Sequence, residues 1–74
     1  MINQSELEIG KCFVTSSKQM RKVIELSNGA IKYEAWSANQ EKPKNPNHVT
    51  VNIDKFCKDV ERAVRCDYRA GFGE

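Results

Sequence analysis

Residues 20–36, MRKVIELSNGAIKYEAW, decide how this 74-residue chain folds. Asn28-Gly29 separates two runs of strand-forming residues, 20–26 and 30–36. An Asn-Gly pair accepts positive φ at both central positions of a tight turn, which makes it the strongest short-range signal for a hairpin. The sequence therefore predicts two antiparallel strands that reverse at residues 28 and 29.

The two-residue loop also predicts which side chains share a face of this hairpin. Counting outward from the turn pairs Ile24 with Tyr33, and the same count pairs Arg21 with Trp36. One face then carries an apolar set, Leu26, Ile31, Ile24, Tyr33 and Ala35. The opposite face carries Glu25, Lys32, Val23, Glu34, Arg21 and Trp36. We expect the first face to pack into the core and the second to face outward.

Further strands are predicted on both sides of the hairpin. Residues 11–15 contain three consecutive apolar side chains and predict the first strand, followed by a turn at 16–18. Residues 48–53 alternate between apolar and polar side chains, so they predict a fourth strand with one buried face. The loop 37–47 before it is polar and contains two prolines, which cannot donate to a strand ladder.

A helix is predicted after the fourth strand, over residues 54–66. Four apolar side chains fall on one side of a helical wheel, namely Phe56, Val60, Ala63 and Val64. Asn52 or Asp54 supplies its N-cap. Near the start of the chain, residues 5–8 fit a capping box, with a single strand over 6–15 as the alternative. Residues 67–74 are either a frayed tail or a short closing strand around Tyr68.

Together these elements predict a single domain over residues 1–74, with an ordered core at about 6–66 and a flexible tail at 67–74. The fold class is α+β and mainly β: a four-stranded antiparallel meander with one C-terminal amphipathic helix. A curled sheet would form a small barrel like the Tudor class, and a flatter one would stay open. A chain this short buries only about 60% of its unfolded surface, so we expect modest stability or help from a partner subunit.

Composition argues for a soluble chain of nearly balanced charge. There are 12 basic and 10 acidic residues, a net charge of +2, which is weak evidence for a polyanion partner. No apolar stretch approaches the length that crosses a bilayer, and the first residues are polar. We therefore expect a cytoplasmic protein without membrane contact, with reduced cysteines. Cys12 and Cys57 would be core residues, and Cys66 a surface thiol able to crosslink two chains on oxidation.

Several motifs resemble small uncharacterised proteins of prophages and other mobile elements. They are Gly10-Lys-Cys-Phe-Val-Thr, Gln19-Met-Arg-Lys-Val, Asn28-Gly29, Ile31-Lys-Tyr-Glu and Phe56-Cys-Lys-Asp-Val60. The resemblance covers roughly residues 9–64 and transfers no catalytic residue or ligand. It implies an accessory protein or inhibitor encoded on a mobile element.

Catalytic and metal-binding constellations are missing from the sequence. No Cys-x-x-Cys pair occurs, and Cys57 and Cys66 would lie half a turn apart on one helix. His48 is the only histidine, and no nucleophile motif accompanies it. No glycine-rich phosphate loop follows a strand. We therefore expect no enzyme, no cofactor and no metal site.

The candidate binding surface is the outward face of the hairpin, with Trp36, Arg21, Lys32 and Glu34. Trp and Arg are the residues most enriched at binding hot spots. The structural alternative is that the helix or the long loop covers Trp36. The hypothesis is a non-enzymatic module that binds another macromolecule, in the first place a protein.

A second hypothesis is nucleic-acid binding through the basic hairpin. Small barrels bind nucleic acid with aromatic platforms and basic rims. Four lysines are candidates for phosphate contacts, Lys11, Lys18, Lys42 and Lys44. Homodimerisation through an open strand edge is a further alternative, because an open sheet has edges that must be managed.

Overall fold

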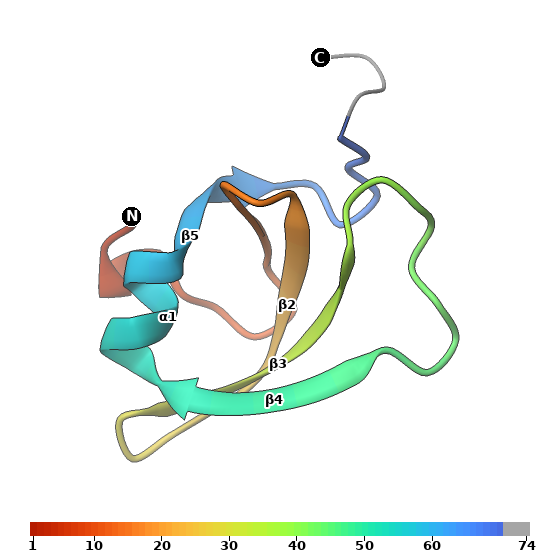
Figure 1. Ribbon diagram of the computed structural model, residues 1–74. Coiled ribbons are helices and arrows are strands. Elements are labelled where there is room, and N and C mark those ends of the chain that lie inside the picture. Colours follow the sequence, from red (N-terminus) through yellow and green to blue (C-terminus); the bar gives the residue numbers. More distant parts are fainter. Residues whose placement is uncertain (71–74) are drawn as a thin grey trace.

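A computed structural model describes residues 1–70 as one curved antiparallel sheet with two short helices (Figure 1). The strands are β1 (Cys12–Thr15), β2 (Gln19–Ser27), β3 (Ala30–Ser37), β4 (Asn47–Asn52) and β5 (Val60–Val64). The helices are the 3-10 turn η1 (Gln4–Glu6) and the α-helix α1 (Ile53–Asp59). The sheet order is β4-β3-β2-β1-β5, so the prediction of a mainly β antiparallel fold is confirmed, with five strands in place of four.

The sheet is open, and β4 and β5 are its two edge strands. Helix α1 lies between them in the chain and carries it from one edge of the sheet to the other (Figure 1). Its N-cap is Asn52, whose side chain accepts a hydrogen bond from the amide of Asp54 at 2.7 Å. That side-chain oxygen satisfies one of the orphan donors of the first turn, as predicted.

The main core lies between the concave side of the sheet and α1, and Phe56 is at its centre. The Phe56 ring meets Phe13 edge-on at 5.7 Å and lies 5.2 Å from Tyr33, between ring centroids. The remaining buried members are Ile2, Val23, Ile31, Ala35, Cys57 and Val60. We call this set the inner core.

The helix is much shorter than predicted. It ends at Asp59, and Val60 is extended, with φ −85° and ψ 148°. Residues 60–64 form β5 and pair with β1, which would otherwise present unpaired backbone groups at that side. The apolar pattern at Val60, Ala63 and Val64 is compatible with a helix or with a strand. Pairing with β1 stabilises the strand. Tyr68 follows the turn at residues 66–67 and forms no closing strand.

The ends of the chain also differ from the prediction. The capping box uses Asn3 and Glu6, where we expected Ser5 and Glu8, and it begins η1. The Asn3 amide donates to the Glu6 carboxylate at 3.0 Å. The part of the predicted tail at 71–74 lies outside the described residues.

The hairpin turn is confirmed, and the predicted register holds only for its first part. Asn28 and Gly29 have φ of 48° and 78°, as a type I′ turn requires. Leu26 lies opposite Ile31, as predicted, and the register then shifts between Val23 and Glu25. This β-bulge at Ile24 makes Val23, and not Ile24, the partner of Tyr33. Every pair farther from the turn is displaced by one residue.

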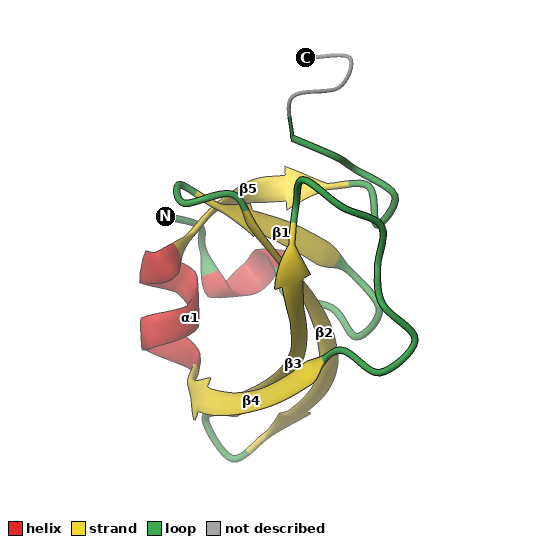
Figure 2. Cartoon of the chain, turned by 45° about the vertical axis from the view of Figure 1, so that its right-hand side comes forward, coloured by secondary structure: helices red, strands yellow, loops and turns green. Residues whose placement is uncertain are grey.

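A second apolar cluster lies on the convex side of the sheet, and we call it the outer cluster. Its buried members are Cys12, Val14, Met20, Trp36 and Ala38, with Val64, Tyr68 and Ala70 packed against them. The loop 38–46 and the segment 65–70 cover it, and they lie side by side in Figure 2. The Ala70 amide donates to the Ala38 carbonyl at 2.8 Å, which ties the two coverings together.

Candidate interaction surface

Trp36 is not an exposed binding residue, so this part of the predicted surface is wrong. The shifted register places Trp36 opposite Met20 in the outer cluster, and its relative exposure is 5%. The Lys42 ammonium lies 5.4 Å from the indole centroid, over its face. Trp36 keeps its predicted face of β3, together with Lys32 and Glu34, but the loop 38–46 and the segment 65–70 cover that face around the indole. The structural alternative, in which the long loop covers Trp36, is therefore the correct one.

Arg21 lies on the opposite side of the sheet from Trp36, so the predicted pair is not formed. Its guanidinium is 4.9 Å from the Tyr33 ring centroid, and its Nε donates to the side chain of Gln19 at 2.9 Å. Nη1 is 3.6 Å from Asp59 of α1, and the side chain is only 14% exposed. Arg21 therefore joins β2 to the helix and covers one end of the inner core.

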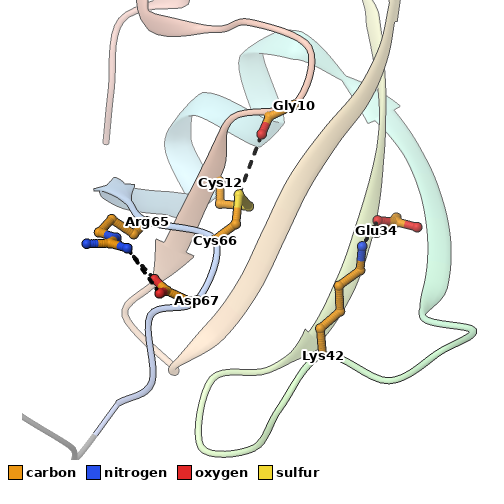
Figure 3. Close-up of a disulfide and its surroundings, with 7 residues drawn as sticks. All are labelled: Gly10, Cys12, Glu34, Lys42, Arg65, Cys66 and Asp67. Carbon is orange, nitrogen blue, oxygen red and sulfur yellow. Dashed lines mark hydrogen bonds and ion pairs between the residues drawn. A yellow bond between two sulfur atoms is a disulfide. The ribbon is translucent and has the colours of Figure 1, made fainter.

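Lys32 and Glu34 do lie on the convex face, where Glu34 is engaged by other residues of the chain. Its carboxylate accepts a hydrogen bond from Lys42 at 2.7 Å and lies 3.4 Å from Nε2 of His48 (Figure 3 shows the lysine pair). The hydrogen bond from Lys42 is the main reason why the Glu34 pKa lies below its ordinary value of 4.5. Glu34 thus fastens the loop 38–46 to β3.

The four lysines predicted to contact phosphates do not form one stripe. Lys11 directly precedes β1 and Lys18 lies beyond its end, so about 13 Å of strand separates them. Lys11 lies 5.8 Å from the Phe13 ring centroid, and Lys42 is paired with Glu34. Lys44 is exposed in the loop. The four charges are therefore dispersed over the molecule and do not form a path that one phosphate backbone could follow.

Two hollows adjoin the loop 38–46. The larger, about 430 Å³, opens beside the turn 16–18 and is lined mostly by amide and hydroxyl side chains, with Lys18 at its edge. The smaller, about 270 Å³, lies between the loop and residues 66–69, beside Trp36 and Tyr68. Cations already lie over both rings, Lys42 over Trp36 and Arg62 over Tyr68 at 5.2 Å. Neither ring is a free platform on which a base or a ligand could stack.

The cysteines are arranged differently from the prediction. Cys12 and Cys66 form a disulfide within the chain, so the expectation of three reduced cysteines, and of Cys66 as a link between chains, is wrong for this structure (Figure 3). Cys57 is free and buried as predicted, and its burial raises the pKa of the thiol. Within residues 1–70, no three His, Cys, Asp or Glu side chains gather where they could hold a metal ion.

Strand β4 is an edge strand whose outer side is open. It pairs with β3 along all of Ala30–Ala35 without a register shift, and none of the other strands in residues 1–70 lies on its far side. It contains no charged side chain apart from the ionisable His48, and no proline. Val49 and Val51 contact the inner core yet remain only half-buried. We call this side of β4 the β4 edge.

The other edge strand, β5, differs in each of these respects. Glu61 and Arg62 stand in the middle of β5. Its pairing with β1 is broken by a register shift between Val14 and Thr15. Charged side chains and bulges are the usual means by which sheet edges are kept from pairing with other chains. β5 has both, and the β4 edge has neither.

Comparison with protein-family models, with curated proteins and with solved structures finds no match for this chain. Among residues 1–70, no helix has the length and apolar character needed to span a membrane.

Proposed function

We propose that this protein is a small non-enzymatic interaction module that binds another protein by accepting an extended segment of it beside β4. The observation that carries the proposal is the β4 edge: a six-residue strand, unbroken, without charged carboxylates or lysines, and open on one side. Strand addition of this kind draws its affinity from main-chain hydrogen bonds and its specificity from alternate side chains.

The half-buried valines support the choice of this edge. Val49 and Val51 point toward the inner core, so a neighbouring strand would complete their burial. Burying apolar surface contributes roughly 25 cal/mol per Å² removed from water. An incoming strand with apolar residues at alternate positions would thus gain affinity from the same face that the core already uses.

A protein partner is favoured over nucleic acid by the arrangement of charge. Nucleic-acid affinity comes mainly from basic groups that follow the phosphate backbone. Here Lys42 is neutralised by Glu34, and Lys11 and Lys18 lie at opposite ends of β1. The aromatic rings nearest to these lysines are buried or already covered by cations.

The proposal extends to architecture and role. We infer a small-barrel type of fold, because the sheet is curved and α1 runs from one edge strand to the other (Figure 1). The resemblance to mobile-element proteins adds the expectation of an accessory or inhibitor that acts by occupying its partner.

The experiment compares protein capture by three forms of the tagged chain from nuclease-treated and untreated lysate. Thr50→Lys places a charge at the centre of the β4 edge, where the side chain is exposed. Glu61→Gln changes the net charge by the same amount at the β5 edge and serves as the matched control. We expect the wild type and Glu61→Gln to capture the same proteins, in nuclease-treated and in untreated lysate. Thr50→Lys should not capture these proteins. The proposal would be contradicted if Thr50→Lys captured these proteins as well as the wild type does, or if nuclease treatment abolished their capture.

A further inference from the structure

The sequence of the β4 edge is complementary to itself. Around Thr50 it reads His48-Val-Thr-Val-Asn52, with a valine on each side of the central threonine. Two antiparallel copies centred on Thr50 would place Val49 opposite Val51 twice and Thr50 opposite its own copy. Threonine opposite threonine is a favourable cross-strand pair, the facing valines would bury apolar surface, and no like charges would meet.

Side-chain direction and proline exclude the register centred on Val49. In an antiparallel pair, opposite residues lie on the same face, so residues 49 and 51 must meet odd-numbered positions. Moving the centre to Val49 would place Asn47 against Val51 on the core side. It would also bring Pro46 into the ladder opposite Asn52, where proline has no amide to donate. The register centred on Thr50 avoids both conflicts.

The same register continues the inner core across the two copies. β4 already pairs Val49 with Tyr33 and Val51 with Ile31 of β3. On the concave face, a row of side chains would then cross four strands. It would contain Tyr33 and Val49 of one copy, followed by Val51 and Ile31 of the second. All four side chains are apolar, and the half-buried valines at the centre would be covered from both sides.

Charges on the convex face do not oppose this arrangement. Lys32 lies opposite Thr50, so the two Lys32 residues would stand in one row on either side of the axis. Three strand spacings would separate them, about 14 Å. Because the screening length at physiological salt is about 8 Å, their repulsion would be largely screened.

From these observations we infer that the occupant of the β4 edge is a second copy of this chain, joined by a twofold axis through Thr50. The inference rests on the proposed function, which assigns strand addition to this edge. A twofold contact of this kind is the commonest symmetry of soluble oligomers. It would turn two five-stranded sheets into one continuous sheet that ends at β5 on both sides, the edge that carries charge and a bulge.

Cysteine crosslinking tests the register directly. In Thr50→Cys the two new thiols would face each other with Cα atoms about 4.5–5.5 Å apart, within the range of a disulfide. In the control His48→Cys, also at an exposed position of β4, the two thiols would lie about 13 Å apart along the strand. We expect mild oxidation by air to join two Thr50→Cys chains, the electrons of the thiols passing to oxygen, and to leave His48→Cys without an intermolecular disulfide.

Sedimentation equilibrium of the unmodified chain measures the association itself. An interface this small should be weak, so the run should cover concentrations from about 10 µM to about 1 mM. We expect a monomer–dimer equilibrium that Thr50→Lys weakens several-fold, more at low salt than at high salt, and that Glu61→Gln leaves unchanged. The fluorescence of Trp36 in the outer cluster checks that each variant remains folded.

The outcomes separate this inference from the proposed function. A chain that stays monomeric at the highest concentration, with no crosslink through Thr50→Cys, overturns the second copy as occupant. Equal crosslinking of Thr50→Cys and His48→Cys overturns the register. If the chain is monomeric yet captures a different protein through the edge that Thr50→Lys blocks, the proposed function stands without the homodimer. If neither association depends on Thr50, both proposals fail.

Discussion

Cys12 and Cys66 are joined by a disulfide with a sulfur–sulfur distance of 2.06 Å, and this bond fastens the segment that covers Trp36. Cys12 belongs to β1, whereas Cys66 begins the turn after β5. Tyr68 and Ala70, a few residues farther on, pack on the outer cluster. The disulfide therefore holds the C-terminal segment at the point where it begins to cross the convex face.

Loss of this disulfide should destabilise the fold and loosen its outer covering. It closes a loop with a sequence separation of 54, and a crosslink of this size stabilises by about 2–4 kcal/mol, mainly by restricting the unfolded chain. We expect Cys66→Ser to lower the free energy of unfolding by that amount and to increase acrylamide quenching of Trp36 fluorescence. Urea unfolding with and without a dithiol reductant measures the effect.

The variant supplies its own control for the reductant. A dithiol should shift the wild-type unfolding curve and leave that of Cys66→Ser in place, because the bond is already missing there. Coincident wild-type curves in the two conditions would show that the bond contributes nothing to stability.

Truncation of Trp36 should damage stability, in contrast to truncation of an exposed binding residue. The indole is 5% exposed and packs with Met20 and Ala38. Replacing a buried Trp with Ala costs about 3–5 kcal/mol, through lost burial and the cavity that remains. Chemical denaturation of Trp36→Ala followed by circular dichroism should show this loss. Lys44→Ala in the exposed loop is the control and should stay within about 0.5 kcal/mol of the wild type.

The elements predicted correctly from sequence are those that depend on neighbours in the chain. The Asn28-Gly29 turn, the pairs next to it and the Asn52 cap each involve residues within a few positions of one another. The alternation in β4 predicted that Val49 and Val51 would point to the core, and they pack against it. These features follow from local backbone preferences and a period of two.

The candidate site failed where one residue changed a long-range register. Nothing in the apolar pattern indicates the bulge at Ile24, because Val23 and Ile24 are equally suited to the core. Counting through the bulge placed Arg21 on the outward face beside Trp36, whereas the bulge turns Arg21 to the concave face. Trp36 keeps its predicted face and is buried there by the loop 38–46 and the segment 65–70. The twist and packing of the whole sheet decide which of the two apolar residues is left unpaired, and a hairpin considered alone does not contain that information.

The helix and the cysteines show the same limit at longer range. Residues 60–64 satisfy a helical stripe, yet they pair with β1, which lies far away in the sequence. Once β5 is formed, it carries Cys66 back to Cys12. The helix predicted over residues 54–66 removed this connection, so the disulfide could be identified only from the sheet order. The predicted meander, in contrast, already placed residues 48–53 at an edge of the sheet.

Substitution of Gly29 should cost stability through backbone conformation alone. Its φ is 78°, and a Cβ added there meets no atom within 4 Å. A left-handed conformation costs a residue with a side chain about 1–2 kcal/mol, part of which the lower entropy of the unfolded chain offsets. We therefore expect Gly29→Ala to lower the free energy of unfolding by about 1 kcal/mol. The control is Asn28→Gly, at φ 48°, which introduces no such strain and should not lower the free energy of unfolding in the same way. A Gly29→Ala variant that is more stable than the wild type would contradict the turn geometry.

The ion pair between Glu34 and Lys42 should make stability depend on pH in the acidic range. The hydrogen bond from Lys42 is the largest cause of the lowered Glu34 pKa, so folding favours the ionised carboxylate. A group with a depressed folded pKa contributes stability above its unfolded value and loses it as pH falls through the folded value. The contribution of Glu34 should therefore be present above its ordinary pKa of 4.5 and disappear below it.

Urea midpoints of the wild type and of Glu34→Gln, measured across this range, test the linkage. We expect the wild type to be the more stable form near neutral pH and the difference to shrink as pH falls below 4.5. Lys42→Met keeps the aliphatic stem near Trp36 and removes the charge that pairs with Glu34. It should therefore also reduce the pH dependence of the urea midpoint. Asp59 also has a lowered pKa, chiefly through Lys55, and Asp59→Asn controls for its share of the acid response. A difference between wild type and Glu34→Gln that stays constant with pH would mean that the Lys42 contact does not hold the loop to β3 in solution.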